Sequence, residues 1–144
     1  MRRSLSLLFS IVVLWAGCSM PARQSLDQIE PMRSYRAGLV EVMQATRSFS
    51  LKEGFKIERF EQDYGRVMGF KRTIGRGMDQ RTGNPENRLI VMDLRLKRVG
   101  EQATDLTASF TFGDGQTVST RDEEGLLVEC YYALFEHLEK NLPR

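Results

Sequence analysis

Residues 89–98 read LIVMDLRLKR. Successive side chains of a β-strand point to opposite sides of its sheet, so the four apolar residues at even positions share one face. These residues are Ile90, Met92, Leu94 and Leu96. The odd positions from 93 onward are charged, which predicts a strand with one buried and one wet face. Residues 106–112 (LTASFTF) repeat the alternation and predict an antiparallel neighbour.

A hairpin is expected upstream of this pair, over residues 55–73. The sequence Asp63-Tyr64-Gly65 supplies a turn between two runs that contain apolar residues. A further short strand is expected over residues 117–119, after a glycine-containing turn. Together these segments predict an antiparallel meander of four to five strands.

The polar stretch from Ile74 to Arg88 contains three glycines and a proline, and it is expected to be a long loop. Rigid scaffolds usually display recognition residues on such loops. Arg76, Arg81 and Arg88 are therefore the candidate partner-binding residues. A solvated connection without a binding role explains the same three arginines more simply.

Two amphipathic helices are expected on either side of the strands. Apolar residues recur at helical spacing from Ser34 to Phe49, with Ser34 as a suitable N-cap and Gly54 as a left-handed terminator. Near the C-terminus, Thr120 and Glu123 have the spacing of a capping box. The following helix has a stripe of Leu127, Cys130, Tyr131, Leu134, Leu138 and Leu142.

Helices with one apolar stripe and a sheet with one apolar face can bury these surfaces only against each other. We therefore expect an α+β fold in which two long helices pack on one face of the antiparallel meander. The domain is expected over residues 34–144. Residues 18–33, which include two prolines and have no sustained apolar period, are expected to be a tether.

The N-terminus has the parts of an export signal. Arg2 and Arg3 precede an uncharged apolar run from Leu5 to Trp15, which is shorter than the ~20 residues that span a bilayer. Without the two arginines, the 21 basic residues of the chain become 19, equal to its 19 acidic residues. A neutral mature chain gives no global attraction to nucleic acid, which we do not expect as a partner.

The sequence Leu14-Trp15-Ala16-Gly17-Cys18 resembles the lipobox of bacterial lipoproteins. The resemblance implies that residues 1–17 are removed and that Cys18 carries lipid and binds the membrane. Trp15 departs from the usual aliphatic residue. Ser19 resembles the class sorted to the periplasmic face of the outer membrane. A plain secreted protein, or one held by its uncleaved apolar run, is the alternative.

The order of the helices and strands is loosely similar to small periplasmic lipoprotein domains, including those of the lipoprotein C subunit of the β-barrel assembly machinery. The similarity covers most of the mature chain as a pattern, and it assigns no binding residue. If Cys18 carries lipid, Cys130 has no disulfide partner. Cys130 is then expected to be a small buried residue of the last helix.

The search for catalytic residues is negative. The single histidine, His137, has no clustered metal ligands or nucleophile beside it in sequence, so we expect it on a solvent-facing rim. No catalytic residue, metal site or cofactor is expected. A basic area on the sheet remains possible if the strands that carry its members adjoin, although Glu58, Glu61 and Asp93 would dilute it. Its members are Arg66, Lys71, Arg72, Arg95, Lys97 and Arg98.

Three functions follow as hypotheses. The first is a non-enzymatic, lipid-anchored envelope protein that binds another envelope protein or stabilises an assembly. The second is a carrier or sensor of a small ligand, bound between helices and sheet by Met43, Met92, Phe110 and Tyr131. These four residues are equally suited to an ordinary core. The third, an enzyme, needs a cluster of acids with shifted pKa values that spacing does not reveal.

Overall fold

The structure is a computed structural model that describes residues 24–78, 83, 85–113 and 121–143. Five strands form one antiparallel sheet in the order β1-β5-β4-β3-β2. They are β1 (Met32–Tyr35), β2 (Lys56–Glu61), β3 (Arg66–Met78), β4 (Pro85–Gly100) and β5 (Ala103–Phe112). Strands β2 to β5 form the predicted meander, and β1 pairs with the other edge of β5. The strand expected at residues 117–119 lies outside the described residues.

The register of the central strands places their apolar residues on one face. Leu94 of β4 lies opposite Val67 of β3 and Ala108 of β5, and all three are buried. The four even-numbered apolar residues of β4 are each at most 6% exposed. The predicted division of this strand into a core face and a wet face is confirmed.

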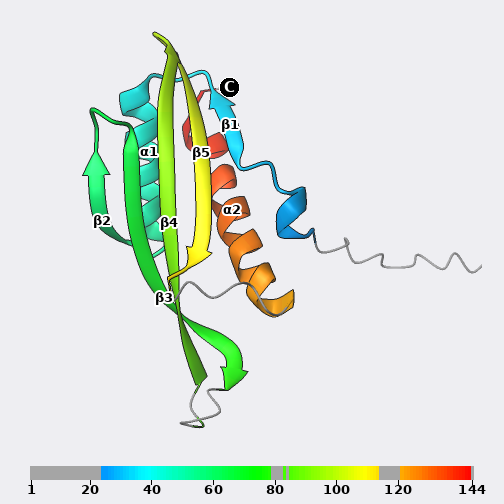
Figure 1. Cartoon of the computed structure of the whole chain (residues 1–144). Coiled ribbons are helices and arrows are strands. Elements are labelled where there is room, and N and C mark those ends of the chain that lie inside the picture. The colour runs from blue at the N-terminus through cyan, green and yellow to red at the C-terminus, as the bar shows by residue number, and fades with distance from the viewer. Residues whose placement is uncertain (1–23, 79–82, 84, 114–120, 144) are drawn as a thin grey trace, which may run out of the picture.

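Two helices cover that core face (Figure 1). Helix α1 (Leu39–Lys52) begins after Gly38, whose backbone N–H donates to the Glu41 carboxylate at 3.0 Å. It ends before Gly54, which adopts a φ of 78° and so turns the chain toward β2, as predicted. Helix α2 (Arg121–Asn141) buries the expected apolar stripe against α1 and the sheet. The α+β fold with both helices on one face is confirmed.

The prediction that the first helix begins at Ser34 is wrong. Ser34 lies in β1, where its hydroxyl donates to Asp105 of β5 at 2.7 Å. The reason is that β5 has a second edge, and β1 satisfies its backbone groups through long-range pairing that local helical spacing does not reveal. Part of the expected tether is also ordered. Residues 26–28 form a 3-10 turn, η1, and the Leu26 N–H donates to Glu124 at 2.7 Å.

The core between helices and sheet is apolar and rich in aromatic rings. Neighbouring ring centroids lie 4.8–6.2 Å apart along one chain of contacts. Its members are Phe49, Phe55, Phe110, Tyr131 and Phe135. No helix in the described part of the chain is long and apolar enough to cross a membrane.

Candidate functional site

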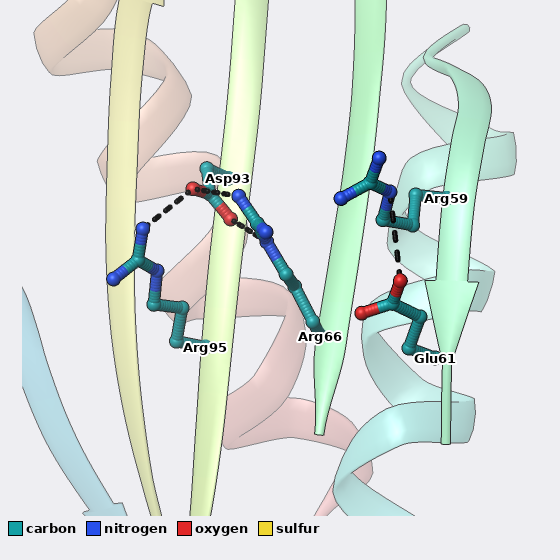
Figure 2. A network of polar contacts seen from close by, with 5 residues as sticks. All are labelled: Arg59, Glu61, Arg66, Asp93 and Arg95. Carbon is teal, nitrogen blue, oxygen red and sulfur yellow. Dashed lines mark hydrogen bonds and ion pairs between the residues drawn. The ribbon is translucent and has the colours of Figure 1, made fainter. Parts of the chain in front are cut away.

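In the described part of the chain, no helix or further strand covers the face of the sheet opposite the two helices (Figure 1). Two arginines and one acid form a network at its centre (Figure 2). The Arg66 guanidinium donates twice to the Asp93 carboxylate, both at 3.1 Å, and Arg95 approaches the same carboxylate at 3.4 Å. Partial burial acts to raise the pKa of Asp93, but the hydrogen bonds and charges of the two arginines outweigh burial and lower it.

The basic area that the sequence left open is only partly brought together on this face, where Arg66 and Arg95 lie opposite each other in the ladder. Lys71 lies on the helix side, where its ammonium is 4.7 Å from the centre of the Phe55 ring. Arg66 and Arg95 share one carboxylate, and Arg59 pairs with Glu61 at 3.6 Å. The uncovered face is therefore a mixed-charge surface, as its interspersed acids indicated.

The expected loop between residues 74 and 88 is the main correction. Strands β3 and β4 extend through Met78 and from Pro85, so most of this stretch is a hairpin. Figure 1 shows it reaching beyond the rest of the sheet, and we call residues 74–78 and 85–87 the arm. Gly75 and Gly77 lie where the register of β3 and β4 shifts, between Ile74 and Met78, and a glycine within a strand often marks such an irregularity.

The three candidate arginines are not gathered into one site. Arg76 lies on β3, and Arg81 lies outside the described residues. Arg88 is only 4% exposed, forms an ion pair of 3.2 Å with Glu123 of α2 and lies 4.3 Å over the Phe112 ring. It therefore joins sheet to helix and is not an exposed recognition residue. The alternation of β4 could have shown this burial, because Arg88 has an even residue number, as the buried residues of that strand do.

A free strand edge lies where the arm leaves the sheet. The pairing of β2 with β3 ends at Lys56 and Phe70, whereas β3 continues to pair with β4 through Ile74 and beyond. Within the described residues, Lys71–Ile74 therefore has a strand on one side only. Sequence reasoning missed this edge because it depends on where two strands end relative to each other.

A groove of about 320 Å³ lies beside this edge, on the helix side. It is bounded by the edge residues Lys71 and Thr73, by β4 and by both helices. Its lining is Phe49, Glu53, Lys71, Thr73, Ile90, Leu126, Glu129, Cys130 and Ala133. Cys130 is buried, as predicted, and burial raises the pKa of its thiol. A thiol held neutral in this way is a packing group.

His137 lies on the rim between the two helices. Its ring centre is 5.8 Å from that of Phe49, and it lines a second hollow of about 300 Å³. Partial burial and the positive charges of Lys52 and Lys140 lower the pKa of His137. The imidazole is therefore neutral at pH 7. In the part of the chain with described coordinates, no group of three or more His, Cys, Asp or Glu could hold a metal ion.

The four residues proposed to line a ligand cavity are part of the packed core. Met43, Met92, Phe110 and Tyr131 are each at most 8% exposed. The Tyr131 hydroxyl donates to the Ala108 carbonyl and accepts from the Phe110 N–H, both at 3.3 Å. Neither the groove beside the β3 edge nor the hollow at His137 is lined by any of these four residues.

No family model matches the chain, and no curated protein matches it. Two solved structures are similar in backbone. A TBP-like protein from Parabacteroides distasonis has a TM-score of 0.41 and 11% identity, with 76% of this chain and 92% of that chain covered. A DUF4468 family protein from Bacteroides ovatus has the same score and identity, with 76% and 83% covered. Similarities at this level carry no residue role or activity over to the present chain.

Proposed function

We propose that the protein is a lipid-anchored, non-enzymatic protein of the bacterial cell envelope that binds a protein partner through its arm. The anchor is lipid on Cys18, and Ser19 directs it to the periplasmic face of the outer membrane. The observation that supports partner binding is the arm itself. A two-stranded ribbon is marginally stable in water, yet here it projects from the sheet with Ile74 69% exposed. A bound partner accounts for both features.

The tether length limits where that partner is held. Leu26, which packs against the core, follows Cys18 by eight positions. Since an extended chain spans at most ~3.5 Å per residue, the domain stays within about 28 Å of the lipid. The N-terminal end of the domain is therefore held close to the membrane surface. This favours a partner that is itself part of the envelope.

Replacing Cys18 by serine should move the protein from the membrane fraction to the soluble periplasmic fraction. Serine cannot form the thioether that holds the acyl chains, and more than one chain is needed for stable attachment. Cell fractionation and mass analysis of the mature N-terminus measure the result. Cys130→Ala is the control and should stay on the membrane, because Cys130 is buried in the fold. An unlipidated wild-type protein that begins at Ser19 contradicts the anchor.

Shortening the arm should abolish partner capture and leave the fold intact. Thr73 and Arg88 are direct partners in the ladder, so a two-residue Asn-Gly turn can join them in place of residues 74–87. A photocrosslinking residue at position 74 should give a discrete adduct in cells. The same residue at Gln44, exposed on α1, is the control and should give none.

Two results decide the role of the arm. The shortened protein should keep its thermal unfolding midpoint within a few degrees, because slack connections contribute little stability. A second crosslinker at Arg72, which both proteins retain, should lose its adduct when the arm is shortened. If the Arg72 adduct persists at full yield, partner binding does not need the arm.

A further inference from the structure

Among the described residues, no strand pairs with the edge of β3 beside the arm on the side away from β4. In an antiparallel sheet, alternate residues direct their N–H and C=O groups to one neighbouring strand and the others to the opposite neighbour. Lys71–Ile74 has β4 on one side. On the other side the ladder with β2 stops at the pair of Lys56 and Phe70, so β2 does not reach Lys71–Ile74. An extended peptide could therefore pair here along the path that β2 leaves open. Such edges are ready templates for strand addition.

The groove beside this edge can accommodate a side chain of such a strand. Lys71 and Thr73 line the groove, so a strand paired with them would direct every second side chain toward it. The apolar lining of the groove consists of the partly exposed Leu126 and Ala133 above the buried Phe49 and Ile90. Its volume of about 320 Å³ accommodates one large apolar side chain. Edge pairing with a side-chain pocket is a recurring mode of peptide recognition.

The charge of the groove indicates which type of residue the bound strand carries next to its large apolar residue. Glu53 and Glu129 both line it, and neither has an ion pair among the described residues. The opposing charge of Lys71 is held over the Phe55 ring at 4.7 Å. Two carboxylates against one ammonium leave the groove with a net negative charge. A basic side chain beside the apolar one complements it.

We propose that Lys71–Ile74 and this groove form a strand-addition site for an extended segment of a partner protein. The segment carries a large apolar residue that enters the groove and a basic residue beside it. The inference rests on the proposed function: the partner is a protein that also contacts the arm, and its capture needs the arm as well as this edge. It adds the conformation of the bound segment and the residue types that are recognised.

The test begins with a display library of random linear decapeptides, selected on the mature protein in detergent. Enriched peptides should share one large apolar residue and a nearby Lys or Arg. A synthetic enriched peptide is then N-methylated at each residue in turn. Methylation removes one backbone donor, so affinity should fall at least tenfold at alternate positions and little at those between. This period of two is specific to strand pairing.

Ala133→Phe tests the groove, because Ala133 lines it and is only partly buried, so a larger side chain fills the space from its rim. Peptide affinity should fall at least tenfold with an unchanged unfolding midpoint. Glu139→Phe, at an exposed position of the same helix, is the matched control and should bind as wild type. Bound peptide should also slow alkylation of the Cys130 thiol, which lines the groove.

Three outcomes overturn the proposal: no enriched peptide, an N-methyl scan without the period of two, or full affinity in Ala133→Phe. Self-association of the wild-type protein that the peptide does not compete with also overturns it, since a second copy then occupies the edge. If the Ile74 crosslink to an envelope protein persists in any of these cases, the proposed function stands. Only the mode of binding is then wrong.

Discussion

Replacing Gly65 by alanine should lower the free energy of unfolding by roughly 3 kcal/mol. Gly65 ends the turn between β2 and β3 with a φ of 58°, a conformation that costs an L-residue roughly 1–2 kcal/mol. A Cβ atom there would also overlap the Leu96 carbonyl oxygen of β4. The overlap would push β4 away and weaken the hydrogen bond of 2.6 Å from the Leu96 N–H to the Gly65 carbonyl. Crowding of this kind costs roughly 1–3 kcal/mol.

Gly54→Ala is the matched control, because Gly54 also has a positive φ, 78°, but a Cβ atom there meets nothing within 4 Å. Its free energy of unfolding should fall only by the backbone cost of a positive φ, about 1 kcal/mol. Urea unfolding of both variants measures the difference, with equal slopes required for the comparison. If the two variants lose the same stability, the close approach of Gly65 to Leu96 is unimportant and the conformation alone matters.

The parts of the fold that local periodicity encodes were predicted from the sequence. The alternation around Leu94 and the helical stripe around Leu134 each repeat several times, and both residues are fully buried. What was missed depends on pairing between distant segments. Strand β1 has four residues and pairs with β5 about 70 positions away, so it has no local signature. The arm was missed because glycines and a proline are typical of loops.

The candidate site was less predictable. Arg88 was assigned to an exposed loop, although it shares strand parity with Ile90 and is buried beside Phe112. The edge at Lys71 and its groove depend on the tertiary arrangement of two strands and two helices, which no spacing reveals. The lipid site at Cys18 depends on enzymatic processing of the N-terminal signal, and it stays a prediction.

Arg88 and Glu123, whose ion pair joins the base of the arm to α2, should be energetically coupled. Glu123→Leu should lower the free energy of unfolding by roughly 3 kcal/mol, because it leaves the buried Arg88 guanidinium without this carboxylate. Arg88→Met should cost less, roughly 1–2 kcal/mol. Glu123 is 15% exposed and can still reach water, and methionine keeps contact with the Phe112 ring.

The double variant decides whether the ion pair or its packing holds the two elements together. Replacing a buried pair by apolar residues of similar size is often neutral, so Arg88→Met with Glu123→Leu should be more stable than Glu123→Leu alone. The coupling energy from the four proteins should exceed about 1.5 kcal/mol, as for residues in direct contact. Because Arg88 pairs with Thr73 within the free β3 edge, amide exchange at residues 71–74 should quicken most in Glu123→Leu. If the losses in the free energy of unfolding are additive and amide exchange at residues 71–74 is unchanged, then α2 does not help to position the free β3 edge.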